Sequence, residues 1–415
     1  RRSEMMEQNK KLRLVIIGAG IAGVSAAEAA HKAKPDTEIL LISAEEVLPY
    51  FRMNLTRYMA GELEKDRLFL HKPDWYEKNE ISLKLGTRVE SIDPEKHLVK
   101  TDAGDEIGYD KLILTAGAHP FVPPFSGKEK RGVQTVRTLD DADLILEICK
   151  DDGEIVCIGG GLLGLEMAGA IAARGAKVTV VEALDWLLPR QLDKTASKIL
   201  TGHIERLGIK VIVPGRTSEI YGEGMAEGIR LDDQTDLPAK LVVVSTGVAP
   251  NLELARSAGL EVNRGVVVSD RMETSVKDIF AAGDIVEHQK RVYGLWAPAK
   301  AMGTVAGKVA VGQEASFPGD PPSTKLKVLG IDMFSVGQFA PSEERDMLVN
   351  QVKDGNYASF LFRNNKMIGS ILLGDASLSA EVKDAVEQGR DFSQLLHGKP
   401  SVDEVKASLT AKAEA

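Results

Sequence analysis

The chain has 415 residues, of which 43% are hydrophobic and 27% charged, an ordinary balance for a globular protein of two or three domains. Its formal net charge of -9 argues against a nucleic-acid-binding protein and weakly against docking on anionic membranes. No uncharged apolar run reaches the ~18 residues of a membrane span, and the polar segment Arg1–Lys11 is not of the secretory type. We therefore expect a cytoplasmic protein that neither enters a membrane nor binds nucleic acid.

The chain begins its ordered pattern with an apolar strand at 14–17, a glycine-rich turn, an Ala-rich helix to Lys34 and a second strand at 38–42. This strand–turn–helix–strand unit has the length of a βαβ module. The turn reads GxGxxG: the first glycine permits the tight turn, the second lets a pyrophosphate approach, and the third packs helix on strand. The helix N-terminus then faces the phosphates. The predicted dinucleotide contacts in this turn are Gly18, Gly20, Ile21, Ala22 and Gly23.

The acid that would bind the adenosine ribose in this module is either Glu45 or Glu46. They follow Gly18 by 27 and 28 residues, just after the second strand ends at Ser43. We favour Glu45, and Glu46 remains the alternative.

A strand at 111–115 runs through Ala116 and Gly117 into a proline-rich connector at 119–124, which suggests a domain crossing. The strand at 241–244, followed by the segment 245–251, repeats that pattern and suggests the return. We therefore predict that a second module is inserted into the first.

The inserted segment repeats the first module, with a strand at 154–158, a second GxGxxG turn, a helix expected over 165–174 and a strand at 177–181. An internal repeat of one module is more informative than either copy alone. The predicted dinucleotide contacts in this turn are Gly159, Gly161, Leu162, Leu163 and Gly164.

Glu182 ends the second strand of this copy, 23 residues after Gly159. A carboxylate there accepts hydrogen bonds from both ribose hydroxyls and repels a 2′-phosphate, and Ala183–Trp186 contains no arginine to pair with such a phosphate. The second module should therefore bind NADH in preference to NADPH.

Two further signals lie downstream. A strand within 278–284 runs into Gly283 and Asp284, which presents a carboxylate from a tight turn.

After the proline-rich segment 318–322 a third region begins, with strands expected at 325–329, 358–363 and 366–373 and a helix from Ser379 to about Gln388. We expect the residues from about Lys406 onward to be frayed.

Five motifs occur in an order that carries a family resemblance: 18–20, 114–117, 159–161, 245–247 and 280–284. Over roughly residues 12–315 the sequence resembles the FAD/NAD(P)-dependent pyridine nucleotide–disulfide oxidoreductase superfamily. The resemblance implies an α/β fold of two Rossmann-like domains, as in glutathione reductase, with FAD in the first and NAD(H) in the second. It places Asp284 on the ribityl chain or pyrophosphate of FAD and adds further cofactor contacts at Ala116, Gly117, Gly247 and Gly283.

The domain boundaries that follow are an FAD-binding domain at 1–117 and 247–319, an NADH-binding domain at 118–246, and a small α+β C-terminal domain at 320–415. Segments 48–52, 187–193 and 293–296, with tail motifs at 326–337 and 367–375, are more specifically similar to NADH:rubredoxin oxidoreductases and to the flavin module of NADH-dependent nitrite reductases.

This closer resemblance implies roles for four side chains. Arg52 should contact FAD, Trp296 should lie near the isoalloxazine, and Glu166 should lie near the nicotinamide. Relatives often carry a lysine near flavin N5 at the place of Arg57, and a guanidinium stays charged where an ammonium can titrate. Arg57 is thus either a catalytic group beside the flavin or an exposed helix arginine.

The chain has only two cysteines, Cys149 and Cys157, with no CxxC pair and no metal-ligand spacing, so no metal site is expected. Relatives with a single redox cysteine carry it in the segment that matches 51–61, where this chain has Met53 or Asn54. A disulfide or sulfenic-acid mechanism therefore lacks its nucleophile.

These observations predict a flavoprotein that takes hydride from NADH and passes single electrons to a separate small redox protein, with rubredoxin as the first candidate. Lys290 and Arg291, with Arg52 and Arg57, could offer an acidic carrier a basic docking face, although solvated loop charge is an equal reading. Oxygen, a nitrite-reducing subunit and a ferredoxin are alternative acceptors, and a non-turnover NADH-binding redox sensor is an alternative function. The sequence leaves open whether the chain forms a homodimer.

Overall fold

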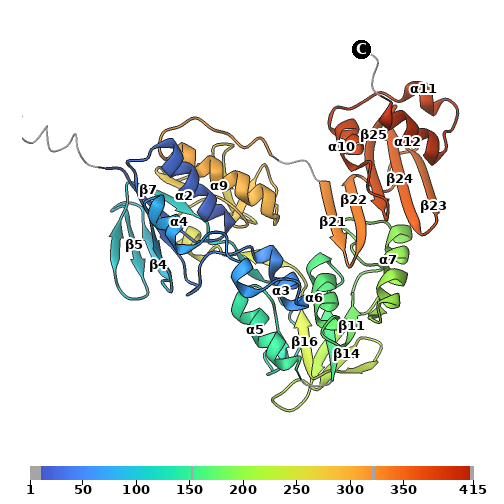
Figure 1. Cartoon of the computed structure of the whole chain (residues 1–415), viewed down its shortest axis with the longest axis horizontal. Coiled ribbons are helices and arrows are strands. Elements are labelled where there is room, and N and C mark those ends of the chain that lie inside the picture. The colour runs from blue at the N-terminus through green and yellow to red at the C-terminus, as the bar shows by residue number, and fades with distance from the viewer. Residues whose placement is uncertain (1–10, 151–152, 320–322, 412–415) are drawn as a thin grey trace, which may run out of the picture. The chain divides into compact units, whose positions relative to one another are not determined.

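The computed structural model describes residues 11–150, 153–319 and 323–411, which divide into two compact units (Figure 1). The first unit contains the described residues of 1–58, 62–120 and 248–320. The second contains the described residues of 59–61, 121–247 and 321–415. The second unit therefore holds both the second glycine-rich turn and the C-terminal sheet.

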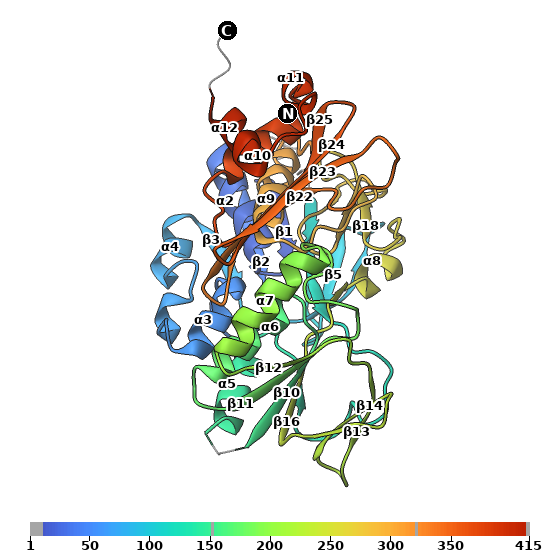
Figure 2. The same ribbon diagram turned by 90° about the vertical axis from the view of Figure 1, so that its right-hand side faces the viewer.

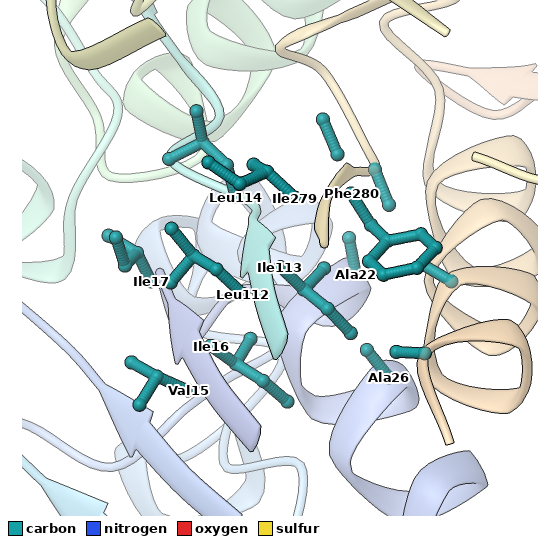
Figure 3. Close-up of a cluster of buried hydrophobic side chains, with 14 of the residues drawn as sticks. Val15, Ile16, Ile17, Ala22, Ala26, Leu112, Ile113, Leu114, Ile279 and Phe280 are labelled. Atoms are coloured by element: carbon teal, nitrogen blue, oxygen red, sulfur yellow. The ribbon is translucent and has the colours of Figure 1, made fainter. Parts of the chain in front are cut away.

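The first unit is built on a parallel sheet whose described strands run in the order β19-β7-β1-β2-β3. The bounds are β19 Ile279–Ala281, β7 Lys111–Leu114, β1 Arg13–Ile17, β2 Glu38–Ile42 and β3 Ile81–Lys84. The central strands are continuous apolar runs because both faces of a parallel sheet are covered. In Figure 3, Ile16 of β1, Ile113 of β7 and Phe280 of β19 lie toward Ala22 and Ala26 in this core.

Two helices of this unit, α2 (Ile21–Ala33) and α9 (Trp296–Ala310), pack with their backbones almost in contact. A Cβ added at Gly303 would lie 2.2 Å from the carbonyl oxygen of Ala22, and one at Gly307 would lie 2.1 Å from that of Ala26. Only glycine fits at these two positions, and the contact fixes the middle of α9 beside the first half of α2.

The remaining described elements of the first unit surround this core, and β4, β5 and β6 form a separate antiparallel sheet. Their bounds are η1 Arg52–Asn54, α3 Leu55–Ala60 (which ends in the second unit), η2 Lys65–Arg67, α4 Pro73–Lys78, β4 Val89–Asp93, β5 Leu98–Thr101, β6 Glu106–Gly108, β8 Ala118–Pro120, β17 Val248–Pro250, α8 Glu253–Ser257, β18 Val266–Val268 and β20 Val286–His288.

The second unit repeats the parallel sheet, in the order β12-β11-β10-β16-β9 for the strands that the structure describes. The sequence prediction of two Rossmann-like modules is thus confirmed. Helix α6 covers Leu162–Ala172 and not 165–174 as expected. It begins directly after Gly161, whose extended backbone (φ -77°, ψ 175°) forms the N-cap.

The other elements of this module, of which β13, β14 and β15 form an antiparallel sheet, were expected only in part. The bounds are β9 Val133–Gln134, α5 Leu139–Ile148, β10 Glu154–Ile158, β11 Lys177–Val181, α7 Lys194–Arg206, β12 Lys210–Ile212, β13 Thr217–Tyr221, β14 Gly228–Leu231, β15 Asp236–Pro238 and β16 Leu241–Val244.

The C-terminal part of the second unit is an antiparallel sheet, in the order β21-β22-β25-β24-β23, with helices α10 to α12 against one face (Figures 1 and 2). The bounds are β21 Ser323–Val328, β22 Ile331–Gly337, β23 Met347–Lys353, β24 Asn356–Arg363, β25 Lys366–Leu373, α10 Ser379–Glu387, α11 Ser393–Leu396 and α12 Val402–Thr410. The expectation of fraying from Lys406 was wrong up to Thr410. A capping box between Ser401 and Glu404 starts α12, and its apolar face is buried.

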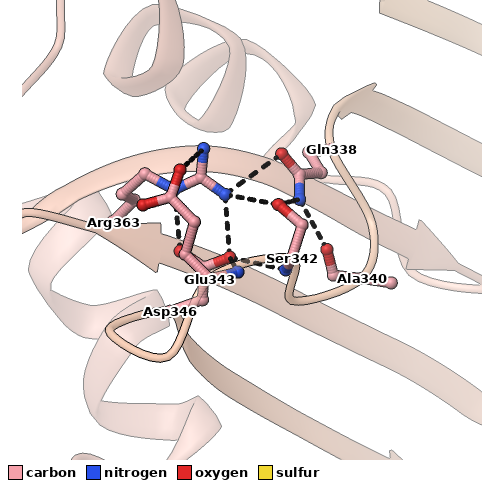
Figure 4. A network of polar contacts seen from close by, with 6 residues as sticks. All are labelled: Gln338, Ala340, Ser342, Glu343, Asp346 and Arg363. Carbon is pink, nitrogen blue, oxygen red and sulfur yellow. Dashed lines mark hydrogen bonds and ion pairs between the residues drawn. The ribbon is translucent and has the colours of Figure 1, made fainter.

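An ion-pair network holds the loop between β22 and β23 (Figure 4). Asp346 accepts hydrogen bonds from Nε and Nη2 of Arg363 at 2.7 and 2.8 Å and from the backbone N–H groups of Ser342 and Glu343. Its side chain is 0% exposed. The Arg363 guanidinium, with these backbone donors, lowers the pKa of Asp346 well below its usual range.

We predict that Asp346→Asn lowers the thermal midpoint of the protein at pH 7, because the charged partner of Arg363 is lost. A carboxylate with a depressed pKa contributes stability above its unfolded-state pKa of about 4, and this contribution falls as the pH drops below that value. Thermal unfolding by circular dichroism should therefore show the wild-type advantage shrinking between pH 6 and pH 2. A difference that does not depend on pH would contradict the assignment.

Candidate functional site

The first glycine-rich turn is shaped by two backbone contacts and one open position. Gly18 has φ +103°, and a Cβ there would lie 2.3 Å from the carbonyl oxygen of Thr115. A Cβ on Gly23 would lie 1.9 Å from the carbonyl oxygen of Gly18, whereas one on Gly20 would meet nothing within 4 Å. The first and third glycines therefore let the chain pack on itself, and the second leaves its space to a ligand.

Thr115 is the residue that sequence reasoning missed in this turn. Its hydroxyl donates to the carbonyl oxygens of Ile17 and Gly18 at 2.9 and 2.7 Å, and its own backbone lies under the turn. In the sequence Thr115 ends an apolar strand and belongs to the motif 114–117, but nothing local indicates its contact with the turn, because that contact joins residues nearly a hundred positions apart.

The second glycine-rich turn has the same geometry. Gly159 has φ +115°, and a Cβ there would lie 2.2 Å from the carbonyl oxygen of Ser245. A Cβ on Gly164 would lie 2.0 Å from the carbonyl oxygen of Gly159, and one on Gly161 would meet nothing. The repeated motif therefore folds twice into the same backbone cradle, which we call the first cradle at 18–23 and the second cradle at 159–164. Leu163, in the first turn of α6, is 40% exposed.

Both turns lead into a helix whose first N–H groups lack a side-chain cap. Gly20 caps α2 and Gly161 caps α6, and neither offers a side-chain acceptor. The first N–H groups of a helix have no partner inside the helix, and the helix dipole adds partial positive charge there. Each cradle thus presents donors and favourable potential to a phosphate group.

Glu182 is held rigidly beside the second cradle. Its side chain is buried, with 8% of the residue exposed. One carboxylate oxygen accepts from the N–H of Gly160 at 2.7 Å, and the other accepts from the N–H of Leu184 at 2.7 Å. Because a carboxylate has about four acceptor positions, lone pairs remain for two ribose hydroxyls. Its fixed charge would oppose a phosphate at the same place.

Glu45 and Arg52 form an ion pair beside the first cradle. Nη2 of Arg52 lies 2.6 Å from Oε1 of Glu45, and the hydroxyl of Tyr50 donates to Oε2 at 2.7 Å. Burial disfavours the charged guanidinium, but Tyr50 and Glu45 outweigh it and raise the pKa of Arg52. Glu46 is exposed. Of the two acids proposed for the ribose, Glu45 is the one that the structure orients.

The Gly283–Asp284 turn packs onto the start of α2. Gly283 has φ +87°, and a Cβ there would lie 2.9 Å from the Cβ of Ala22. This contact brings Asp284, which is half-buried, to the same end of the sheet as the first glycine-rich turn.

The other predicted cofactor contacts lie at the two domain crossings. Gly117 has φ +66°, and the Ala116 carbonyl accepts a hydrogen bond from Nδ2 of Asn251 at 2.7 Å. Gly247 has φ +115° and belongs to the second unit.

Trp296 begins helix α9 and stacks on Phe51, with ring centroids 6.1 Å apart and an interplanar angle of 27°. Its Nε1 is buried, and no atom of the described residues accepts a hydrogen bond from it. A buried donor without a partner is costly, so this N–H suits a ligand that supplies an acceptor. The orphaned donor and the open space at Gly20 both fit a bound dinucleotide in the first unit.

Arg57 lies on α3 in the first unit, and Glu166 lies on α6, the helix that begins at the second glycine-rich turn. Arg57, on α3, is 53% exposed and pairs with Glu62 at 3.1 Å. Glu166 is half-buried on α6, five residues after Gly161. Their assignment to the flavin and the nicotinamide stays a prediction.

The two thiols lie in the second unit, and burial disfavours the thiolate form of both. Cys157 is fully buried in β10, and burial raises its pKa to about 12. Burial also raises the pKa of Cys149. Across the described residues there is no group of three or more histidine, cysteine or acidic side chains that could hold a metal ion, and no helix long and apolar enough to span a bilayer.

Comparison with known proteins assigns both parts of the chain. Residues 12–303 match the family described as pyridine nucleotide-disulphide oxidoreductase, and residues 322–390 match the rubredoxin NAD+ reductase C-terminal domain. The chain is 34% identical to NADH-rubredoxin oxidoreductase of Clostridium acetobutylicum, over 93% of this chain and 97% of that protein. The crystal structure of the NADH:rubredoxin oxidoreductase from that organism superposes with a TM-score of 0.81, at 31% identity, over 96% of this chain and all of that one.

The chain is also 37% identical to nitrite reductase [NAD(P)H] of Bacillus subtilis, over 92% of this chain but only 48% of that protein. The assimilatory nitrate reductase electron transfer subunit of the same organism is 35% identical over 92% of this chain and 50% of its own length. The chain thus spans about half the length of these two relatives.

The two open glycines allow each cradle to be tested separately. Because Gly20 and Gly161 have φ near -75° and no neighbour at the Cβ position, alanine should fold at both. We predict that Gly20→Ala weakens FAD retention on the order of tenfold, a change of about 1.4 kcal/mol, while NAD+ binding is kept. Gly161→Ala should do the reverse. Flavin absorbance after gel filtration and calorimetric titration with NAD+ measure the two effects, and an identical outcome for both variants would contradict two separate sites.

Proposed function

The chain belongs to the pyridine nucleotide-disulphide oxidoreductase family, and from this premise we propose that it is an FAD-dependent NADH oxidoreductase that reduces a small redox protein, with rubredoxin as the first candidate. FAD would occupy the cradle of the first unit and NADH that of the second. The observation that carries the proposal is the duplicated glycine cradle, because two dinucleotides are needed and two matching sites exist.

The acids beside the two cradles support this distribution of cofactors. Glu182 is buried and already fixed by two backbone donors, which suits recognition of an unphosphorylated ribose and hence of NADH. In the first unit, Glu45 would hold the FAD ribose while its ion pair with Arg52 fixes the position of the carboxylate. Asp284, on the turn against Ala22, would bind the ribityl chain or pyrophosphate.

The missing thiol supports direct reduction of the acceptor. In the segment matching 51–61 the side chains at the redox position are Met53, which is 59% exposed, and Asn54. Neither can form a disulfide or a thiolate. Bound FAD supplies hydride acceptance and one-electron release, so that a separate one-electron carrier completes the reaction.

The protein's own groups would bind, orient and exclude water. Trp296 and Phe51 form an apolar wall in the first unit, and the Trp296 N–H offers a hydrogen bond to the cofactor. Arg52 places fixed positive charge beside the same cradle. Glu166, on the helix that begins at the second cradle, would face the nicotinamide.

A second candidate function is supported by the two Bacillus subtilis relatives. Both proteins are about twice as long as this chain. Their names describe a nitrite reductase and an electron transfer subunit of nitrate reductase. In this alternative the same NADH-reduced flavin serves a nitrite- or nitrate-reducing partner.

Steady-state NADH oxidation with a panel of acceptors tests the proposal. We expect the purified protein to carry FAD and to reduce rubredoxin with NADH at least on the order of tenfold faster than with NADPH, since Glu182 would repel a 2′-phosphate. A colourless protein that cannot be reconstituted with FAD would contradict it. Faster turnover with a nitrite- or nitrate-reducing partner than with rubredoxin would favour the alternative.

The carrier would dock through a basic face that includes Lys290 and Arg291. Lys290 is exposed with φ +63°, and the Arg291 guanidinium lies 4.8 Å from the ring centre of Tyr293, three residues before Trp296. We predict that Lys290→Glu with Arg291→Glu slows reduction of an acidic carrier on the order of tenfold at low salt, because electrostatic steering reverses sign. The deficit should shrink as ionic strength rises.

Lys96→Glu with Lys100→Glu is the matched control for that variant, since both lysines are exposed on the hairpin of β4 and β5. It changes the net charge by the same amount and should leave carrier reduction near the wild-type rate. Reduction of ferricyanide should be the same in all three proteins. Equal slowing by both double variants would assign the effect to net charge and not to a docking face.

A further inference from the structure

The central strands β22, β25 and β24 of the C-terminal sheet bury both of their faces, and helices α10 to α12 cover one of them. Alternate residues such as Phe360, Phe362 and Leu372 pack against α10 to α12. On these strands the residues between them point the other way, and six of them are at most 2% exposed: Met333, Tyr357, Ser359, Leu361, Ile371 and Leu373. The second face is open at the edge strand β23, where Leu348 and Val352 are exposed. Tyr357 of this second face and the turn of the β21–β22 hairpin contact helices α7 and α6 of the nucleotide module in the same unit.

The tip of the β21–β22 hairpin fits into a notch on α6. The turn consists of Leu329 and Gly330, both with positive φ, which is the pattern of a tight two-residue hairpin. A Cβ added at Gly169 would lie 2.0 Å from Cδ2 of Leu329. Gly169 follows Glu166 by three residues, so the Leu329 side chain touches the helix face that also carries Glu166.

Two hydrogen bonds fix the sheet to α7. Nε2 of His203 donates to the carbonyl oxygen of Leu329 at 2.8 Å. The hydroxyl of Tyr357 donates to Oδ2 of Asp193 at 2.6 Å, while Oδ1 of Asp193 caps α7 through the N–H of Ala196. Burial, together with the Asp193 carboxylate, raises the pKa of Tyr357 to about 12, so it remains a donor at neutral pH.

Asp193 is in turn connected to the second cradle by a packed loop. The loop 183–193 directly follows Glu182. Its Leu187 is fully buried and packs on Gly160, because a Cβ added at Gly160 would lie 2.5 Å from Cδ2 of Leu187. The N–H of Leu188 donates to the carbonyl oxygen of Gly160 at 3.1 Å. Movement of Asp193 would therefore be transmitted to the Gly160–Glu182 hydrogen bond.

We infer that the C-terminal region is a positioning element for the dinucleotide site of the second unit, in which Leu329 sets α6 and Tyr357 sets the loop that ends at Asp193. The inference rests on the proposed function only in taking that dinucleotide to be NAD(H). Neither residue touches the cradle itself. Each acts through a helix or loop that does.

Calorimetric titration of the FAD-loaded full-length protein with NAD+ tests the inference without turnover. Tyr357→Phe removes one hydroxyl and should weaken NAD+ binding about fivefold, since a hydrogen bond to a charged group is lost. Leu329→Ala should weaken it on the order of tenfold through loss of buried packing on α6. Thermal unfolding of each variant verifies that titrations are made on folded protein.

A compensating pair gives a readout that general destabilisation would not produce. Gly169→Ala should by itself displace Leu329 and weaken NAD+ binding. Combined with Leu329→Ala, the new methyl group enters space that the leucine has left, so the double variant should bind NAD+ more tightly than either single variant. Additive weakening in the double variant would overturn the inference.

Asp346→Asn is the matched control, because it perturbs the same sheet at the β22–β23 loop, where Asp346 bonds Arg363 and not α6 or α7. Its dissociation constant for NAD+ should equal that of the wild type. The inference is overturned if this control weakens binding as much as Tyr357→Phe, or if Tyr357→Phe and Leu329→Ala bind like the wild type. If the wild type binds NAD+ but NADH does not reduce its flavin, the proposed function is refuted. The present inference would still stand in that case.

Discussion

Each glycine-rich turn is fixed to its sheet by backbone contacts that leave no room for a side chain. Thr115 lies beneath Gly18, Ser245 lies beneath Gly159, and the third glycine of each motif packs on the first. These contacts bring the start of the following helix directly over the end of the first strand. The helix N–H groups and the open second glycine then face outward, where a pyrophosphate can reach them. All other features of the two sites are arranged around this geometry.

The two cradles are nearly identical in backbone but differ in the charge placed beside them. Glu182 accepts hydrogen bonds from two backbone N–H groups, and a carboxylate held there would act on a ribose bound in the second cradle. Glu45 is paired with Arg52, and the aromatic pair of Phe51 and Trp296 lies in the same unit. A duplicated backbone motif can thus receive two different dinucleotides because the side chains after the second strand differ.

A chain without a reactive thiol must rely on positioning. A disulfide relay would carry electrons through covalent bonds, whereas here the dinucleotides and the acceptor have to be held in productive geometry by packing and hydrogen bonds. Buttressing of α6 and of the loop after Glu182 by the C-terminal sheet is consistent with that demand. The contact from the second face of the sheet is the hydrogen bond of Tyr357 to Asp193.

The sequence by itself determined the elements whose signals are local. The two GxGxxG turns, the strands at 38–42, 154–158 and 177–181, and the acid Glu182 follow from spacing and apolar pattern within about 30 residues, and the structure has these strands at those bounds. It failed at the start of α6 and at α12, because a glycine N-cap and a capping box give weaker signals than an apolar repeat.

Only the tertiary structure decided the contacts between distant segments. Thr115 under Gly18, Asn251 on Ala116, the α2–α9 contact at Gly303 and Leu329 in the Gly169 notch join residues between 97 and 281 positions apart. The hydrophobic pattern of a sequence does not predict such pairs. It indicates which face of a helix or strand is buried, but not which other segment covers that face. The ion pair of Glu45 with Arg52 likewise depends on how the chain turns after β2, which spacing alone does not fix.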